Sequence, residues 1–387
     1  MPSRREVALV AASLVFAGAM AEVGLRIAGI AYPVFHRLET LRGWSPQPGL
    51  SGRWMTEGEA LIENNREGFR DRHHDLAKPP GTFRVAVLGD SMSEALAVPL
   101  EKTFWSILER RLSACRKAPA EVLNFSVPGY GTAQQRLTLQ HNVLKYDPDL
   151  VLLAFFTGND VWNNARELDG HEDRIYYVLE NGVLRLDDSN TNSSRFKTKM
   201  FWRGIGNAIV NTSRLVQLTR EFYTRTKTAL RSDKKQSGAV FNPENPDYEI
   251  FKPPATPEWE RAWATTEALF AALRDDAKAS GAAFWIANLT APVQVYPDRQ
   301  IRRDFAQALG VDNLDYPDQR VAAVATQLGI PAITLVDPLR DYADKNAAYL
   351  HGFENTRLGT GHWNKTGHRL AGEHIAKALC DNGQATK

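Results

Sequence analysis

The stretch FRVAVLGDS at residues 83–91 decides the fold. It is apolar from residue 83 to residue 88 except for Arg84, and Gly89 ends the run, so residues 83–89 are predicted to form a buried strand. A strand that is apolar on both faces is typical of a parallel sheet covered by helices on both sides. The stretch therefore predicts an α/β fold with Ser91 just beyond the carboxyl end of a central strand.

The alternation of strands and helices continues along the chain. We predict, in chain order, the strand 83–89, a helix from about 103, the strand 121–127, a helix over 132–145, the strand 149–156, a helix near 257–280, the strand 282–289, a helix near 316–328, the strand 332–336 and a last helix from about 364 to 379. This order predicts a flavodoxin-like three-layer α/β/α sandwich with a five-stranded parallel sheet.

The alternation breaks between about residues 167 and 257. Residues 175–186 form two alternating runs joined by Asn181-Gly182, which predicts a β-hairpin, and a long helical stretch follows at about 201–231. We interpret this region as an insertion over one end of the sheet. The chain then divides into an N-terminal segment (1–32), a lead-in segment (33–82) and an α/β domain (83–387) that carries the insertion.

The N-terminal segment has the features of an export signal. Two arginines at positions 4 and 5 precede an uncharged apolar run from Val7 to Ala21, which favours membrane insertion with the N-terminus held inside. Apolar character resumes after Glu22 and Arg26, which are spaced to pair within one helix. We favour an uncleaved membrane anchor. A signal peptide cleaved after Ala19-Met20-Ala21 and a buried helix of a cytoplasmic protein are the alternatives.

The overall charge is nearly balanced. The 387 residues carry 47 basic and 45 acidic side chains, a net charge of +2, and 43% of the residues are hydrophobic. This balance gives no electrostatic reason to expect nucleic-acid binding. The insertion holds a local basic cluster, which predicts a solvated helix face or, alternatively, contact with an anionic polymer or lipid headgroups: Lys197, Lys199, Arg203, Arg225, Lys227 and Arg231.

Four separated segments are expected at the carboxyl edge of the sheet, where open α/β sheets bind ligands. They are Gly89-Asp90-Ser91, Pro128-Gly129-Tyr130, Gly158-Asn159-Asp160 and Gly361-His362-Trp363-Asn364. A serine and a histidine can act as nucleophile and general base, and a glycine N–H and an asparagine amide are suitable donors to an oxyanion. Each segment alone is also compatible with an ordinary turn or helix cap. We expect Asp90, Asp160 and Asn364 to support these segments, Asp90 by bonding its own loop.

Taken together and in this order, Ser91, Gly129, Asn159 and His362 resemble the four blocks of the SGNH, or GDSL-like, hydrolase superfamily. The resemblance covers residues 83–165 and 282–380 of an SGNH hydrolase-like domain. It implies that Ser91 attacks an ester carbonyl and that His362 takes the serine proton. It also implies an oxyanion hole formed by the N–H groups of Ser91 and Gly129 and by the Asn159 side chain.

Three further features resemble an exported, membrane-anchored bacterial branch of that superfamily: the apolar start, the segment Gly68-Phe69-Arg70-Asp71 and the run His362-Trp363-Asn364. The resemblance implies a single-pass protein of the bacterial inner membrane with its catalytic domain in the periplasm. Secretion after cleavage of the signal segment is the alternative.

One position departs from the family pattern. The family usually places an aspartate two or three residues before the histidine to orient the imidazole, but this chain has Thr360 and Gly359 there. Either a backbone carbonyl holds the imidazole N–H, or a carboxylate comes from elsewhere, with Glu354 and Asp337 the nearest in sequence.

The resemblance implies an extracytoplasmic serine esterase that acts on acyl esters, O-acetyl esters above all, through an acyl-serine intermediate. The alternatives are an O-acyltransferase that modifies an envelope polysaccharide and a catalytically degenerate, glycan-binding member. The expected partners are an acyl ester or O-acylated glycan and, through the N-terminal helix, the membrane. We expect no cofactor, no metal ion and no nucleic acid.

The two cysteines, Cys115 and Cys380, lack the spacing of a metal site. In a doubly wound sheet of the order 2-1-3-4-5, the first and last helices cover the same face. Both cysteines fall near the ends of those helices, so this geometry allows a disulfide, and two buried thiols are the equal alternative.

Overall fold

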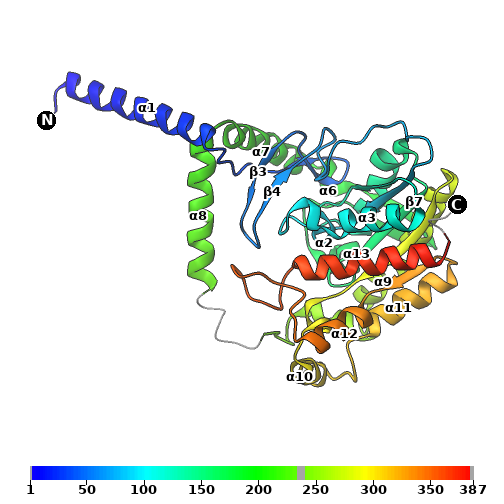
Figure 1. Ribbon diagram of the computed structural model, residues 1–387. Coiled ribbons are helices and arrows are strands. Elements are labelled where there is room, and N and C mark those ends of the chain that lie inside the picture. Colours follow the sequence, from blue (N-terminus) through cyan, green and yellow to red (C-terminus); the bar gives the residue numbers. More distant parts are fainter. Residues whose placement is uncertain (1, 233–239, 384–387) are drawn as a thin grey trace.

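A five-stranded parallel sheet forms the centre of the protein, which a computed structural model describes over residues 2–232 and 240–383 (Figure 1). The strands are β5 (Phe83–Leu88), β6 (Ala120–Asn124), β7 (Leu150–Phe156), β10 (Ala283–Leu289) and β11 (Ala332–Thr334). They lie in the order β11-β10-β7-β5-β6, and every neighbouring pair is parallel. Counted along the chain this is the order 2-1-3-4-5, so the predicted flavodoxin-like fold is confirmed.

The sheet separates two hydrophobic cores. Along β5, Val85 and Val87 belong to one core and Ala86 and Leu88 to the other, because successive side chains of a strand point to opposite faces. Every position of β5 is buried, including Arg84. The Arg84 guanidinium donates to Glu121 (2.8 Å) and to the carbonyl of Tyr146 (2.7 Å), which satisfies the one charged side chain in the strand.

Helices cover both faces of the sheet. One core contains residues of α3 (Phe104–Arg116), α12 (Val336–Asn346) and α13 (Lys365–Asp381), and the other contains residues of α9 (Pro257–Ala279) and α11 (Tyr316–Gln327). The predicted helix 132–145 is α4 (Thr132–Thr138) followed by a π turn and a 3-10 turn that end at Tyr146. The remaining short helices are α2 (Ser91–Glu94), α5 (Arg166–Asp169), α6 (Ser189–Asn192) and α10 (Arg299–Leu309). The three layers of the prediction are therefore present.

Of the two alternatives for Cys115 and Cys380, the structure has the disulfide. Helices α3 and α13 lie side by side (Figure 1), and the two cysteines at their ends have Cα atoms 6.4 Å apart. The bond joins positions separated by 265 residues, so it ties the beginning of the sheet domain to its end.

We expect the double variant Cys115→Ser/Cys380→Ser to lose about 2–5 kcal/mol of unfolding free energy, because the bond restricts the unfolded chain over a long loop. Denaturant unfolding of the oxidised protein and the variant measures this difference. Adding reductant should destabilise the wild-type protein only. Equal midpoints for the variant and the oxidised wild type would contradict the expectation.

The lead-in segment forms two antiparallel hairpins that the sequence did not predict. They are β1 (His36–Glu39) with β2 (Gly43–Pro46), and β3 (Ser51–Trp54) with β4 (Ala60–Glu63). Their strands are only four residues long, too short for a clear alternating pattern. The buried Arg70 then donates to the backbone carbonyls of Glu94, Ala95 and Val98. These hydrogen bonds attach the lead-in segment to the residues that follow Ser91. The domain boundary at residue 82 stays a prediction.

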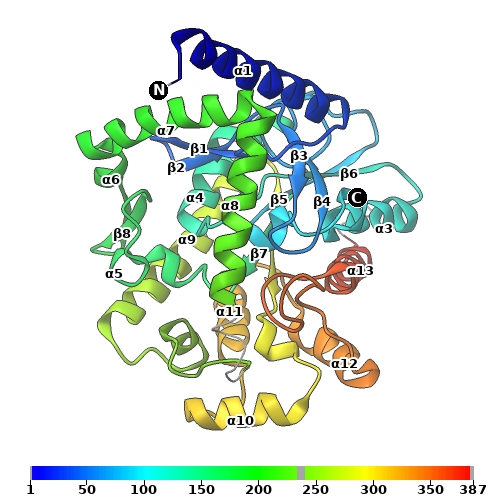
Figure 2. The ribbon, with the colours of Figure 1, turned by 90° about the vertical axis from the view of Figure 1, so that its left-hand side faces the viewer.

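The insertion contains the predicted hairpin and two long helices. Strands β8 (Tyr176–Glu180) and β9 (Val183–Asp187) are joined at Asn181 and Gly182, whose φ angles are 50° and 78°. The expected helical stretch is two helices, α7 (Ser194–Thr212) and α8 (Arg214–Ser232), with an extended residue, Ser213, between them. Figure 2 shows α7 and α8 meeting in an L shape on the side of the molecule from which α1 projects.

The N-terminal helix α1 (Arg4–Ile27) projects from the body of the protein (Figure 1). Among the described residues it is the one helix long and apolar enough to cross a membrane. The predicted pair of Glu22 and Arg26 is present at 2.7 Å. Glu22 also accepts hydrogen bonds from the backbone N–H groups of Arg214 and Leu215 (both 2.9 Å), so it caps α8. The charged pair inside the apolar segment therefore fixes α1 to the junction of α7 and α8.

Candidate active site

Ser91 is the first residue of α2 and follows strand β5 after a two-residue turn. Asp90 precedes it and accepts a hydrogen bond from the backbone N–H of Met92 (2.9 Å), so the aspartate bonds its own loop as expected. Ser91 remains partly exposed at the carboxyl edge of the sheet. Its Oγ lies 2.8 Å from Nε2 of His362, so the structure brings together the two residues that the sequence analysis paired across 271 positions.

His362 lies in the loop before α13, and its neighbours hold this loop. The buried Trp363 donates from Nε1 to Thr290 Oγ1 (3.0 Å). Asn364 caps α13 by accepting from the N–H of Thr366 (2.9 Å). The imidazole itself keeps 36% of its surface exposed, so it is positioned by its loop yet open to a substrate.

The carboxylate that the sequence analysis could not locate is Glu57. Its Oε2 lies 2.5 Å from Nδ1 of His362, and its Oε1 accepts the backbone N–H of the same histidine (2.7 Å). The neutral imidazole then donates from Nδ1 to Glu57 and accepts the Ser91 hydroxyl proton at Nε2. Ser91, His362 and Glu57 therefore form the hydrogen-bonded chain of a serine–histidine–acid triad.

Both sources proposed for this carboxylate were wrong. The Asp337 side chain is 79% exposed and faces Arg340, and Glu354 lines a neighbouring cavity. A backbone carbonyl does not hold the imidazole either, because Nδ1 is occupied by Glu57. Glu57 lies 305 positions before His362, in the turn between two strands of an unpredicted hairpin, so proximity in sequence gave no indication of it.

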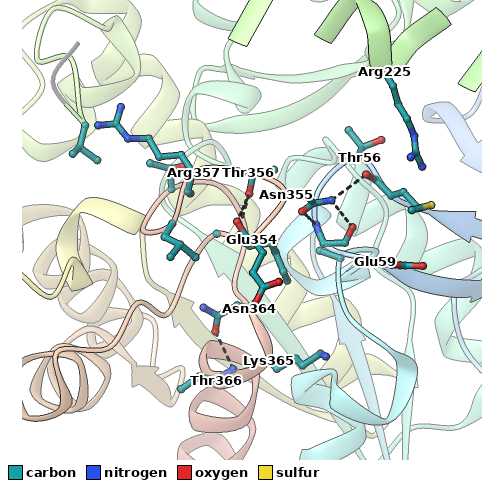
Figure 3. Close-up of a pocket in the computed structure, with 18 of the residues that line it drawn as sticks. Thr56, Glu59, Arg225, Glu354, Asn355, Thr356, Arg357, Asn364, Lys365 and Thr366 are labelled. Carbon is teal, nitrogen blue, oxygen red and sulfur yellow. Dashed lines mark hydrogen bonds between the residues drawn. The ribbon is translucent and has the colours of Figure 1, made fainter. Parts of the chain in front are cut away.

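The turn that carries Glu57 is attached to the histidine loop. Asn355 donates from Nδ2 to the carbonyls of Met55 (3.2 Å) and Gly58 (3.0 Å), and its Oδ1 accepts the N–H of Gly58 (2.9 Å), as the dashed lines in Figure 3 show. Gly361 has φ of 71°, and a Cβ at this position would lie 2.2 Å from Glu57 Oε1. Only glycine allows the histidine loop to approach the carboxylate so closely.

The charges of the pair shift both ionisation equilibria. Burial alone lowers the pKa of His362, but the hydrogen bond and charge of Glu57 outweigh it and raise that pKa above its ordinary value. Burial alone raises the pKa of Glu57. The hydrogen bonds to His362 lower it by more than burial raises it, so the pKa of Glu57 is below its ordinary value. Glu57 therefore stays ionised, and its charge favours the protonated form of the His362 imidazole.

The predicted oxyanion donors lie on the loops beside Ser91. In the described part of the chain, the backbone N–H groups of Ser91 and Gly129 have no hydrogen-bond partner. Gly129 has φ of 72°, and a Cβ there would come within 3.3 Å of the Trp44 ring. Asn159 is close enough to Asp90 for its side chain to lower the pKa of that aspartate. Two unpaired N–H donors and an amide next to the serine loop are the groups that an oxyanion requires.

Asp90 and Asp160 are two buried carboxylates in the loops that follow β5 and β7. Burial raises the pKa of Asp90 to about 6, and burial together with the charge of Asp90 raises the pKa of Asp160 well above its usual range. Asp160 accepts the N–H of Phe156 (2.9 Å) at the end of β7. Neither carboxylate hydrogen-bonds to His362 among the described residues. Asp90 and Asp160 therefore bond their own loops, whereas Glu57 is the carboxylate that hydrogen-bonds to His362.

A cavity of about 1860 Å³ opens beside the acid–base end of the triad. It is lined by the neighbours of Glu57, such as Thr56 and Glu59, by the histidine loop from Gly352 to Thr360, and by Arg225 of α8. Figure 3 shows Arg225 reaching towards the cavity from the side opposite the histidine loop. Helix α8 of the insertion therefore forms one wall of this cavity.

No protein-family model and no curated protein sequence matches this chain. Solved structures similar to it include an acetyl xylan esterase (12% identity, 77% of this chain and 100% of that one, TM-score 0.39). A lipase/acylhydrolase from Enterococcus faecalis (12% identity, 78% and 96%, TM-score 0.37) and a GDSL-like lipase from Bacteroides thetaiotaomicron (13% identity, 77% and 88%, TM-score 0.33) are also similar.

Proposed function

We propose that this protein is a serine ester hydrolase of the SGNH type that forms an acyl-enzyme on Ser91. The hydrogen-bonded chain from Ser91 Oγ through the imidazole of His362 to Glu57 carries the proposal. A serine hydroxyl is a weak nucleophile until a neighbouring base takes its proton, and an oriented, carboxylate-backed imidazole is suited to do so.

The chemistry follows from these positions. The Ser91 proton moves to His362 Nε2 as Oγ attacks the ester carbonyl, and the N–H groups of Ser91 and Gly129 with the Asn159 amide hold the oxyanion. The alcohol leaves with the proton that His362 returns, and Ser91 keeps the acyl group. Water then gives a proton to His362 and attacks the acyl-serine, and the carboxylic acid is released as His362 returns that proton to Ser91 Oγ.

The variant Asn159→Ala should lower kcat by about 10²–10³-fold, because one preorganised donor to the oxyanion is lost. KM should change little, since the ground-state carbonyl is held less strongly than the oxyanion. Steady-state kinetics with a chromogenic acyl ester measures both constants. Asn163→Ala, a change on the next turn of the same loop, serves as the control. A loss in KM alone would contradict the proposed role of Asn159.

An acyltransferase is the second candidate, and the size of the cavity favours it. Pockets for small molecules usually have volumes of about 300–1,000 Å³. The cavity beside Glu57 and His362 is larger, about 1860 Å³, and is lined by many polar side chains, as suits a segment of an envelope glycan. A glycan hydroxyl bound there would replace water in the second step. The hypothesis of a catalytically degenerate, glycan-binding protein was supported only by the absence of an aspartate before His362. Glu57 takes the place of that aspartate.

We further propose that the catalytic domain is extracytoplasmic. The disulfide between Cys115 and Cys380 suits an oxidising compartment, and α1 has the length and hydropathy of a signal anchor. The polar contacts of α1 with the body come from Glu22 and Arg26. They lie after Ala21, so either anchoring or cleavage after that residue leaves them in place.

The test of this function is acyl release from an O-acetylated polysaccharide, with and without an unacetylated glycan acceptor. Free acetate in both reactions supports hydrolysis, whereas acetate transferred to the acceptor supports the acyltransferase. Absence of release and of transfer, from this polysaccharide and from small acyl esters alike, would overturn both. The same assay on the Ser91→Ala variant gives the background.

A further inference from the structure

Helix α7 presents an apolar face that the fold does not cover. Phe201, Trp202, Ile205 and Ile209 recur at helical spacing and are 39–64% exposed. The opposite side of the helix is attached to the body, where Asn207 and Asn211 donate to backbone carbonyls of the lead-in. The apolar face is therefore turned outward by the way the helix is anchored.

Helix α8 repeats this arrangement. Its inward side carries the buried Gln217 and the cavity-lining Glu221, Thr224 and Arg225. Phe222 and Tyr223 are 72% and 65% exposed, and Leu215 and Val216, about two turns earlier on the same side, are 37% and 38% exposed. The helix thus has a polar face towards the cavity and an apolar face away from it.

The charge of the two helices is strongly positive. Residues 194–232 contain nine arginines and lysines but one acidic residue, Glu221. In α7, Lys197 and Arg203 are exposed beside the apolar face, and in α8 the same holds for Arg220 and Lys227. An apolar face with basic flanks and a tryptophan or tyrosine is typical of helices that lie in the interface of an anionic membrane.

Polar contacts with α1 fix how the apolar faces of α7 and α8 are oriented relative to that helix. Arg26 of α1 donates to the carbonyl of Thr212, and Glu22 caps α8, so α1 leaves the body at the junction of α7 and α8. In Figure 1, α8 runs crosswise to α1 at this point. Figure 2 looks at the molecule from the side where α1 projects and shows both α7 and α8 on that side. A membrane crossed by α1 would meet the outer faces of both helices.

We propose that the outer faces of α7 and α8 form a second membrane contact, an interfacial surface that binds anionic lipid independently of catalysis. This contact fixes the orientation of the domain, which a single helical anchor alone leaves free. Since the opposite side of α8 is a wall of the cavity, the contact also holds this cavity close to the lipid surface. Substrates presented at that surface, such as membrane-proximal glycans or lipid esters, are the ones it favours.

Site-directed spin labelling of the full-length protein in vesicles with anionic lipid tests this surface. Both native cysteines are in the disulfide, so the variants Trp202→Cys and Phe222→Cys each provide one thiol for a label. Each labelled site should be more accessible to oxygen, which partitions into lipid, than to a water-soluble nickel chelate. Raising the salt concentration or replacing anionic with zwitterionic lipid should weaken this preference.

Leu76→Cys is the matched control. Leu76 is 52% exposed, yet its carbonyl accepts a hydrogen bond from Arg84 at the start of β5, which places it at the opposite edge of the sheet. A label there should remain accessible to the nickel chelate. If the labels at positions 202 and 222 are equally water-accessible, the proposal is overturned. If both are shielded from oxygen and nickel alike, the surface binds protein instead, which also overturns it.

Discussion

Replacing Ser91 with alanine is expected to lower kcat for ester cleavage by about 10⁶-fold. The remaining rate should exceed the uncatalysed rate only by the small acceleration that the oxyanion donors provide. The reason is that no other hydroxyl in the described structure contacts His362. Without the Ser91 oxygen the acyl-enzyme cannot form, and the loss should appear in kcat while substrate binding is retained. Single-turnover kinetics with a chromogenic ester measures it.

Ser93→Ala is the appropriate control for this variant. Ser93 lies two residues further along, is fully buried, and its Oγ has no hydrogen-bond partner among the described residues. Its removal should leave kcat within a few fold of the wild-type value. Equal activity losses in the two variants would mean that the loop, and not the nucleophile, has been damaged.

Replacing Glu57 with glutamine is expected to lower kcat by about 10⁴-fold, as loss of the orienting carboxylate does in a serine triad. Glutamine keeps the size of the side chain but removes the charge that stabilises the imidazolium. The effect should also appear in the pH profile. Glu57 raises the pKa of His362. The midpoint of the acid limb in the pH profile of kcat/KM should therefore lie above the ordinary histidine pKa of about 6.5 in the wild-type protein.

The sign of the shift in the variant follows from the same pKa. His362 acts as a base only when neutral, so activity is present above its pKa and is lost as the pH falls through it. Glu57→Gln removes the group that raises this pKa, so the acid limb should move to lower pH. Glu59→Gln, an exposed carboxylate on the same turn that does not contact His362, should leave the acid limb in place. Full activity in Glu57→Gln, or a comparable loss in Glu354→Gln, would contradict the assignment of the acid.

The sheet was predictable because its strands are buried on both faces. Runs such as 83–88 and 150–156 are then nearly continuous in apolar residues, and the loops after them hold Ser91 and Asn159 at one edge. The strand order was inferred from the doubly wound topology, and the proximity of Cys115 and Cys380 followed from it, whereas the bond itself did not. The same order explains why residues 271 positions apart meet at hydrogen-bonding distance.

Glu57 was not predictable for the opposite reason. It lies in a turn between two four-residue strands, and its position depends on tertiary contacts rather than local pattern. Asn355 and Gly361, on a loop about 300 residues away, provide those contacts. A lead-in segment that packs on the catalytic edge can supply a residue that the domain's own motif lacks. The aspartate missing before His362 was the one sequence signal that such a residue had to come from elsewhere.

The most direct test of the triad is the rate at which a fluorophosphonate labels the protein as a function of pH, with the modified residue identified by peptide mass spectrometry. We predict a single adduct on Ser91 that forms faster as the pH rises through the His362 pKa, and a much slower reaction in Glu57→Gln. Absence of labelling in a folded wild-type protein, or an adduct on another residue, would contradict the account.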